Sequence, residues 1–297
     1  MRVLISGTSG LIGSALCRKL AHDGDETAAL VRHSPQAGEV QWNPRHALDP
    51  QRLFDFDAIV HLAGKNIAGR WSQKFKQEVR ESRVLGTRTL AVAAADSFRR
   101  CGNPRAFICA SAVGYYGNRG DEVLTEASAP GEGFLPETCV AWETAADPAR
   151  EAGMRVAHLR IGVVLAKHGG ALPPLLLPFR LGLGGRIGDG RQFWSWVELE
   201  DVAGAFAFAL HNQSVSGPVN VVAPNSARVS EFVRALGDVL HRPTIVPLPA
   251  FAVRMLLGEM GETLLLSSVR VMPEKLQTSG YRFAHPGLQG ALETLLA

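Results

Sequence analysis

The stretch "ISGTSGLIGSAL", residues 5–16, places Gly7, Gly10 and Gly13 three positions apart, between an apolar segment and a segment with helical spacing. Glycine at such a turn permits a tight bend and a close approach of a ligand to the backbone, and the helix that follows presents unpaired N–H groups to an anion. A second apolar stretch ends about 20 residues further on, as in dinucleotide-binding folds. An ordinary strand-to-helix turn is the alternative. The stretch predicts a pyrophosphate site formed by Gly7, Thr8, Ser9, Gly10, Leu11, Ile12 and Gly13.

The same alternation of strand and helix continues along the chain. Apolar stretches rich in β-branched residues occur at residues 2–6, 26–31, 57–62, 106–110 and 155–165. Segments with helical spacing lie between them, at 11–22, at 74–100 with an expected break near residues 85 and 86, and at 136–152. Strands that alternate with helices form parallel sheets with helices on both faces. The predicted fold is α/β, a Rossmann-type doubly wound parallel sheet with a smaller C-terminal substrate lobe.

The pattern is interrupted after Leu165 by a segment rich in glycine and proline, residues 166–190, which leads to aromatic residues at 193–196. A helix at 199–212 and a strand at 219–222 then resume the first pattern. We therefore predict a nucleotide-binding Rossmann domain and a substrate-binding lobe. The first comprises residues 1–165 and a returning segment of about 197–222. The second comprises 166–196 and 223–297, and we expect Gln192, Trp194, Ser195 and Trp196 to shape its pocket.

Composition excludes several classes of partner. The formal net charge of +3 comes from 31 basic and 28 acidic residues scattered along the chain, which is too slight an excess to indicate nucleic acid. The four cysteines show no paired spacing, so neither a zinc site nor a disulfide framework is expected, and free thiols fit a reducing, cytoplasmic location. The histidines at 61 and 158 lie in apolar strands and are interpreted as satisfied core residues rather than metal ligands.

A membrane partner is not expected either. The amino terminus leads directly into a strand-like stretch, which argues against a signal peptide. The apolar run "LPPLLLPF", residues 172–179, contains prolines, is followed by Arg180, and is far shorter than the roughly 18 residues of a membrane span.

The end of the second strand indicates which dinucleotide is bound. In "LVRHS", residues 30–34, Arg32 stands where an NAD-preferring site carries Asp or Glu for the ribose hydroxyls. A guanidinium can donate a pair of hydrogen bonds to a 2′-phosphate. The sequence therefore predicts NADP rather than NAD, with a solvated arginine at a strand end as the alternative. Leu62, Ala63 and Gly64 end another strand, at the edge where open α/β sheets bind ligands, and we expect them beside the cofactor.

These motifs resemble the extended and atypical short-chain dehydrogenase/reductase superfamily, and more closely its epimerase-family subgroup with a C-terminal DUF1731 tail. The likeness is carried by "DAIVHLAG" (57–64), "ESRVLGTRTL" (81–90), "SAVGYYG" (111–117), "CVAWE" (139–143), "LRIGVVL" (159–165) and "LLGEMGETLLLSSVRVMPEKLQTSGYRF" (256–283). The resemblance implies a DUF1731-like tail at about 249–296. It also implies that Glu78 and Arg83 lie near the cofactor, that the substrate is a small molecule, and that a homodimer can form through the helices after the third and fourth strands.

Members of the wider superfamily carry a Tyr-x-x-x-Lys pair on the helix that here contains Cys139 and Glu143. A nearby carboxylate disfavours thiolate, so we expect the pKa of Cys139 to lie above its ordinary value of about 8.5. Glu143 could still accept hydrogen bonds from ribose hydroxyls. A buried inert thiol and a surface glutamate are the alternatives.

Two further residues are candidates for the active site. Ser111 follows a strand at the ligand-binding edge and is predicted to contact a substrate hydroxyl, and Tyr116 is a less favoured replacement for the absent phenol. The leading hypothesis is an NADP-dependent oxidoreductase or epimerase that transfers hydride on a small hydroxylated or sugar-nucleotide-like substrate. The alternative is a catalytically weak or inactive NADP-binding sensor or partner protein.

Overall fold

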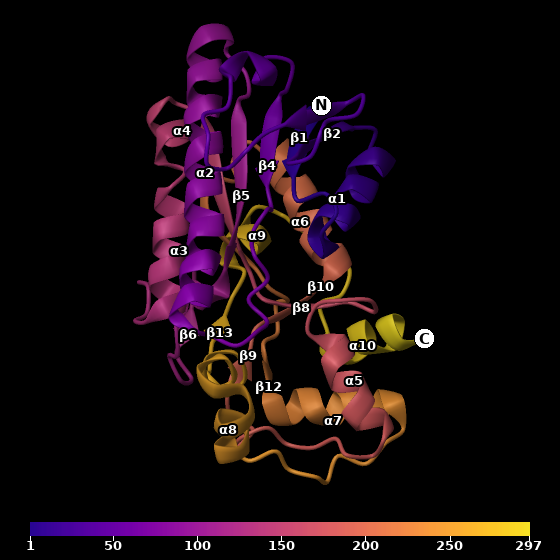
Figure 1. The fold of residues 1–297 in the computed structure, drawn as a ribbon. Helices are drawn as coiled ribbons and strands as arrows, with labels where there is room; N and C mark the ends of the chain where they lie inside the picture. The colour runs from indigo at the N-terminus through magenta and orange to yellow at the C-terminus, as the bar shows by residue number, and fades with distance from the viewer.

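The computed structural model describes residues 1–297, and its centre is a seven-stranded parallel sheet (Figure 1). The strand order is β11, β7, β5, β4, β1, β2, β3. The strands are β1 (Arg2–Ser6), β2 (Glu26–Val31), β3 (Glu39–Gln41), β4 (Ala58–His61), β5 (Ala106–Ala112), β7 (Arg155–Ile161) and β11 (Gly217–Val221). Every pairing between them is parallel. The predicted α/β Rossmann-type fold is confirmed.

Helices cover both faces of this sheet. α1 (Leu11–His22) and α6 (Leu199–His211) pack together on one face, and α2 (Gln73–Cys101), α3 (Phe134–Thr144) and α4 (Asp147–Glu151) lie together on the other (Figure 1). The inner strands are therefore covered on both sides, and β4 is buried at each of its positions. This double covering explains why the strands read as continuous apolar runs in the sequence.

The long helix α2 passes through Gly86 without the break expected there. Gly86 is buried against Trp42 and His61, and a Cβ at this position would approach their rings at 3.3 and 3.4 Å. The glycine therefore permits close packing of the helix on the sheet. It does not end the helix.

Two other predicted elements are divided in the structure. The segment predicted as one helix forms α3 and α4, and Pro148 lies in the first turn of α4, where its missing N–H costs no hydrogen bond. The strand predicted at 155–165 is interrupted at Gly162, where a Cβ would lie 2.3 Å from the carbonyl oxygen of Ser195. The strand is interrupted at Gly162 because the backbone after β7 packs closely against the backbone of the lobe.

Most of the remaining elements form a lobe beyond the carboxyl ends of the strands, whereas α9 (Glu274–Thr278) packs on β11 (Figure 1). The lobe contains three two-stranded sheets, which pair β8 (Val163–Leu165) with β10 (Trp196–Glu198), β9 (Phe193–Trp194) with β12 (Ala227–Arg228), and β6 (Val123–Leu124) with β13 (Arg270–Val271). Its helices are α5 (Leu172–Arg180), α7 (Val229–Leu240), α8 (Ala250–Gly261) and α10 (Leu288–Leu296). Three short helical turns are η2 (Val113–Tyr116), the π-helical η3 (Glu262–Leu266) and η1 (Pro50–Leu53), of which η1 lies outside the lobe and packs on α2.

Buried apolar side chains form two main clusters. One of 42 residues surrounds the parallel sheet, and one of 17 residues lies within the lobe, between residues 165 and 295. The domain bounds drawn from the sequence stay a prediction. None of the helices combines the length and the apolar composition that crossing a bilayer requires.

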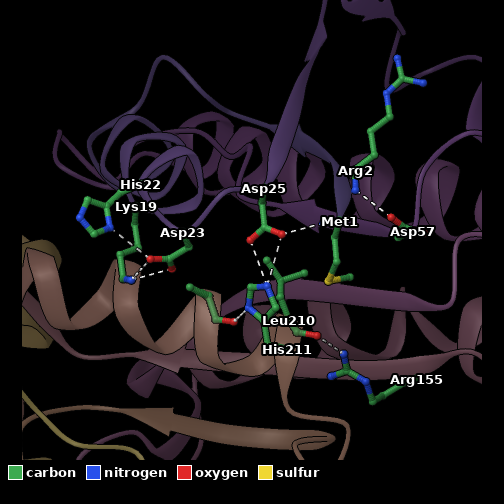
Figure 2. Close-up of polar contacts among 11 residues, drawn as sticks. Met1, Arg2, Lys19, His22, Asp23, Asp25, Asp57, Arg155, Leu210 and His211 are labelled. Atoms are coloured by element: carbon green, nitrogen blue, oxygen red, sulfur yellow. Dashed lines mark hydrogen bonds and ion pairs between the residues drawn. The ribbon is translucent and has the colours of Figure 1, made fainter.

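Polar contacts tie α6 to the amino end of the sheet (Figure 2). The carboxylate of Asp25 accepts a hydrogen bond from the Met1 nitrogen at 2.8 Å and lies 3.0 Å from Nε2 of His211, the last residue of α6. Arg155, at the start of β7, donates at 2.7 to 3.0 Å to the carbonyl oxygens of Ala209, Leu210 and Val215. These contacts provide hydrogen-bond partners for carbonyl groups at the end of α6. The candidate site lies at the opposite, carboxyl edge of the sheet.

Candidate functional site

The predicted pyrophosphate turn joins β1 to α1 at the carboxyl edge of the sheet. α1 begins after Gly10, and neither a capping side chain nor an acidic residue occupies its first turn. The backbone N–H groups of Leu11, Ile12 and Gly13 donate to no protein acceptor. β1 lies between β2 and β4, where the strand order reverses, and open α/β sheets bind ligands beside that point. The arrangement fits an anionic group at the start of α1.

The glycines of this turn have different structural roles. Gly7 adopts a φ of +78°, and a Cβ there would approach the backbone nitrogen of Ala63 at 3.0 Å. A Cβ on Gly13 would lie 2.1 Å from the carbonyl oxygen of Gly7. The nearest atom to a Cβ on Gly10 is that same oxygen, at 3.3 Å. The absence of a side chain at Gly7 and Gly13 therefore allows the turn to pack closely against the end of β4 and against α1. At Gly10 the backbone remains accessible to a ligand.

Arg32 follows β2 directly and is exposed at the same edge of the sheet. No carboxylate lies in ion-pair distance of its guanidinium, and the neighbouring His33 ring contacts the carbonyl oxygen of Ser34 at 2.9 Å. The side chain is therefore available to a ligand.

Leu62 and Ala63 follow β4 and are held against β1 by one hydroxyl group. Oγ of Ser6 accepts hydrogen bonds from the backbone nitrogens of Leu62 and Ala63 at 3.1 and 3.2 Å. It also lies 2.6 Å from Nδ1 of His61. The end of β4 is thereby fixed beside the glycine turn, as the sequence predicts for a cofactor wall.

Glu78 and Arg83 lie on α2 and support the loop that continues from Gly64. Glu78 forms an ion pair with Lys65. Arg83 donates from Nη1 to the carbonyl oxygen of Lys65 at 3.0 Å and packs its guanidinium over the Trp142 ring, 5.0 Å from the centroid. Both side chains are engaged within the protein, so a direct contact with a cofactor stays a prediction.

Glu143 forms an ion pair that the sequence did not reveal. Its carboxylate accepts two hydrogen bonds from Arg160, from Nε and Nη2, each at 2.8 Å. It accepts a third from Oγ of Ser111 at 2.7 Å. The side chains of Arg160 and Glu143 are 3% and 13% exposed, so a bidentate pair is buried where the superfamily carries a lysine.

Tyr116 belongs to the same network. Nη1 of Arg160 donates to the Tyr116 hydroxyl at 3.0 Å, and that hydroxyl donates to Oδ1 of Asn220 at 2.7 Å. Burial raises the pKa of the Tyr116 phenol, although the positive charge of Arg160 opposes this. The guanidinium of Arg160 also stacks over the Tyr115 ring, 3.4 Å from its centroid.

Strand register explains why these residues meet. Arg160 of β7 is paired with Ser111 of β5 on one side and with Asn220 of β11 on the other. Because cross-strand neighbours point to the same face of a sheet, the three side chains form one polar row beneath α3. Glu143 projects from α3 onto that row and neutralises Arg160. Burial alone would lower the pKa of the Arg160 guanidinium, but the contacts with Glu143 outweigh it and the pKa is raised.

Cys139 lies on the same helix and is 4% exposed. Burial raises the pKa of its thiol to about 12, and the negative charge of Glu143 adds to the effect. The direction agrees with the expectation from the sequence, but burial is a larger cause than the carboxylate. A thiol in this state does not exchange a proton near neutral pH.

The two core histidines lie deeper on the same face of the sheet. His61 and His158 flank Cys109 in register, and burial lowers the pKa of each imidazole to about 4. Their placement in the core is confirmed. The interpretation as satisfied residues is wrong for His158, because neither of its ring nitrogens has a hydrogen-bond partner, and it is only half right for His61, whose Nε2 has none.

The lobe residues expected in a pocket serve mainly to join strands. Oγ of Ser195 donates to the carbonyl oxygen of Val269 and accepts from the nitrogen of Val271, at 2.6 and 2.8 Å. Trp194 and Trp196 belong to the apolar cluster of the lobe. Gln192 donates to the carbonyl oxygens of Ile187 and Leu265.

Comparison with known families matches most of the chain. Residues 3–223 match the model of the NAD dependent epimerase/dehydratase family, and residues 248–295 match a domain of unknown function, DUF1731. Epimerase family protein Mb2239 of Mycobacterium bovis is 44% identical over 98% of this chain and 96% of its own. YfhF of Bacillus subtilis is 36% identical over 100% and 98%, and human SDR39U1 is 37% identical over 100% of both chains.

Solved structures show the same relationship. The crystal structure of human epimerase family protein SDR39U1 (isoform2) with NADPH is similar with a TM-score of 0.89 and 36% identity, over 99% of both chains. A nucleoside-diphosphate sugar epimerase from Corynebacterium glutamicum gives a TM-score of 0.81 and 35% identity, covering 100% of this chain and 58% of that one. UDP-N-acetylglucosamine 4-epimerase from Bacillus cereus, at 17% identity and a TM-score of 0.77, shares the fold.

Proposed function

Because this chain belongs to the NAD dependent epimerase/dehydratase family, we propose that it binds NADP(H) along the carboxyl edge of its parallel sheet. The observation that carries the proposal is the uncapped start of α1, whose free N–H groups lie where the strand order reverses. The NADPH in the crystal structure of the human relative supports it. The pyrophosphate would lie against Gly7, Gly10 and the first turn of α1, with Leu62, Ala63 and Gly64 as the facing wall.

The preference for the phosphorylated dinucleotide is assigned to Arg32. Its exposed, unpaired guanidinium follows β2, at the place where a 2′-phosphate lies in this fold. Glu78 and Arg83 are assigned a supporting role, because they hold the loop after β4.

We propose further that the four candidate catalytic residues do not form a proton relay of the tyrosine–lysine kind. Ser111 and Tyr116 are buried and Glu143 is 13% exposed; Ser111 donates to Glu143, Arg160 links Glu143 to Tyr116, and burial raises the pKa of the Cys139 thiol to about 12. The hydroxyl hydrogens of Ser111 and Tyr116 are donated to Glu143 and Asn220, so in this arrangement neither proton is available to a substrate hydroxyl. This closed network favours an NADP-binding protein with little turnover by that route.

Hydride transfer on a small hydroxylated or sugar-nucleotide-like substrate is the second candidate function. It is favoured by contacts that join the lobe to the loop after β4 and to the start of α2. The backbone nitrogen of Gly69 donates to Sδ of Met260 at 3.4 Å, and Lys76 pairs with Glu259 at 2.5 Å. Bound NADP(H) would supply or accept the hydride there.

Titration with NADPH and NADH, followed by tryptophan fluorescence, tests the cofactor assignment. We expect tighter binding of NADPH, and we expect Arg32→Glu to weaken NADPH by about ten- to a hundredfold while leaving NADH nearly unchanged. Arg18→Glu, an equal change of charge on the exposed side of α1, is the matched control. Equal affinity for the two cofactors in the unmodified protein would overturn the assignment.

Incubation with NADP(H) and a metabolite extract distinguishes the two candidate functions. Turnover predicts a change in cofactor absorbance and new masses in the extract. Persistent absence of both, at a cofactor concentration shown to saturate the protein, identifies the binder.

We also propose that the chain forms a homodimer through α2 and α3. Their outer faces expose Leu85, Val92 and Val140, and Val84 and Val140 line an open groove of about 600 Å³ between the two helices. Light scattering of the protein and of Val140→Glu tests this, since a dimer through this face should dissociate in the variant.

All four cysteines are free, which supports a reducing, cytoplasmic location.

A further inference from the structure

Large exposed apolar side chains gather at one end of the lobe. Of the 14 such residues in the protein, nine lie between residues 177 and 183 or between 245 and 257. We call this set the apolar pole: Leu177, Leu181, Leu183, Ile245, Val246, Phe251, Met255, Leu256 and Leu257. Ile245 and Met255 are 79% and 75% exposed, so these side chains protrude from the surface. Clusters of this kind mark surfaces that have a partner.

The loops that contain residues 181–186 and 245–248 run side by side. The backbone nitrogen of Val246 donates to the carbonyl oxygen of Gly184 at 3.1 Å, and that of Leu248 donates to the carbonyl oxygen of Arg186 at 2.8 Å. Figure 1 shows α5 and α8 on the lobe, with α7 between them, at the end of the molecule opposite the amino end of the sheet. The apolar pole therefore lies on the lobe, beyond the carboxyl ends of the strands.

Helix α8 is apolar on two faces. Val253 is fully buried and belongs to the apolar cluster of the lobe. Phe251 and Met255, one helical turn apart, face outward at 69% and 75% exposure, and Leu256 beside them is 69% exposed. A surface helix of a globular protein needs only one apolar face, so the second indicates contact with another apolar phase.

The charged side chains within the two segments are all basic, and the next carboxylates along the chain, Glu259 and Glu262, form ion pairs with Lys76 and Arg254. Residues 172–186 and 241–258 contain four arginines and one histidine and no aspartate or glutamate. Arg254 pairs with Glu262, whereas the guanidinium groups of Arg180, Arg186 and Arg242 pair with no carboxylate. Protruding apolar side chains bordered by unpaired arginines match the boundary between acyl chains and anionic headgroups.

We propose that the apolar pole docks this protein on the surface of a bilayer that contains anionic lipid. The apolar side chains would enter the headgroup and acyl boundary, and Arg180, Arg186 and Arg242 would contact lipid phosphates. This departs from the expectation drawn from the sequence, which rejected a membrane partner because "LPPLLLPF" is too short to span. In the structure that run supplies Leu177 to a surface and spans nothing.

Sedimentation with lipid vesicles tests the proposal on the full-length protein. We expect binding to phosphatidylcholine vesicles that contain roughly 30% phosphatidylglycerol, weaker binding to phosphatidylcholine alone, and loss of binding as salt rises from about 50 to 500 mM. Leu181→Ser and Met255→Ser should each reduce partitioning by about tenfold. Phe251→Trp supplies a reporter, whose fluorescence should shift to the blue on adding the anionic vesicles.

Val123→Ser, at an apolar side chain that is 48% exposed outside the pole, is the matched control and should bind vesicles like the unmodified protein. NADPH affinity and the unfolding midpoint, measured for every variant, identify a variant that fails to fold. The proposal is overturned if no vesicle sediments the folded protein or if Val123→Ser is as defective as Leu181→Ser. It is also overturned if the pole variants change oligomeric state in light scattering without changing vesicle binding, because the occupant is then a second copy of the chain.

Discussion

Removal of the Glu143 carboxylate should destabilise the protein strongly. In Glu143→Ala the Arg160 guanidinium, 3% exposed, loses two charge-assisted hydrogen bonds of 2.8 Å, and Oγ of Ser111 loses its acceptor. Arg160 keeps the Tyr116 hydroxyl at 3.0 Å and its contacts with the rings of Tyr115 and Tyr116, none of which carries a negative charge. Breaking a buried ion pair on one side costs about 3 to 5 kcal/mol, because the remaining charge stays desolvated. We expect a loss of that size in the free energy of unfolding.

Urea denaturation followed by tryptophan fluorescence measures this loss, since the chain has five tryptophans. The double variant Glu143→Leu, Arg160→Met removes both charges, so its cost should fall below the sum of the single variants by about 2 kcal/mol or more. A cost below about 1 kcal/mol for Glu143→Ala would refute the reasoning that a buried, coupled pair organises this edge of the sheet.

The same variants test whether Glu143 holds a ribose. The glycine turn and Arg32 belong to β1, α1 and β2, which the substitution does not touch. NADPH affinity should therefore change by less than about threefold. A much larger loss of affinity in a variant that remains folded would restore the ribose contact inferred from the sequence.

Three further predictions concern other parts of the fold. His158 is neutral when folded, with a pKa lowered from an ordinary 6.5 to about 4, so its contribution to stability is complete above pH 6.5 and is lost as pH falls to 4. The free energy of unfolding should therefore decrease as the pH falls from 6.5 to 4. In His158→Leu this decrease should be smaller by about 3 kcal/mol, and an unchanged pH dependence would contradict the reasoning. Gly13→Ala should lower NADPH affinity by about a hundredfold or more, because its Cβ would lie 2.1 Å from a backbone oxygen. Gly290→Ala is the control and should leave the affinity unchanged, because no atom lies within 4 Å of its Cβ. Fluorescence titration of both variants with NADPH tests this. Arg155→Met removes three hydrogen bonds to backbone carbonyl oxygens and should cost about 2 to 4 kcal/mol in urea denaturation, so a cost near zero would mean that water replaces the guanidinium.

Much of the fold could be predicted from short stretches of the sequence. The predicted bounds of β1, β2 and α1 agree with the structure residue for residue, because hydrophobic periodicity and the glycine turn act over neighbouring positions. The errors arose where a distant segment decided the outcome. Gly86 reads as a helix breaker until Trp42 and His61 are packed against it, and Gly162 reads as part of a strand until the carbonyl group of Ser195 approaches it.

The candidate catalytic residues show the same limit. The sequence singled out Ser111, Tyr116, Cys139 and Glu143 as candidates, and in the structure Glu143 accepts a hydrogen bond from Ser111 and is linked to Tyr116 through Arg160. It missed Arg160 and Asn220, although a charged residue inside the apolar run "LRIGVVL" was a signal that could have been followed. The hydrogen bond from Ser111 to Glu143 joins residues 32 apart, and that from Tyr116 to Asn220 joins residues 104 apart.

The sequence by itself determined the order of strands and helices, the bare turn before α1 and the arginine after β2, since each depends on residues that are neighbours in the chain. Only the tertiary structure decided that Arg160 neutralises Glu143 and that two distant loops bearing exposed apolar side chains pair through backbone hydrogen bonds. Both results depend on which strands and loops lie side by side. That choice is made by packing across the whole molecule, and no local pattern of residues encodes it.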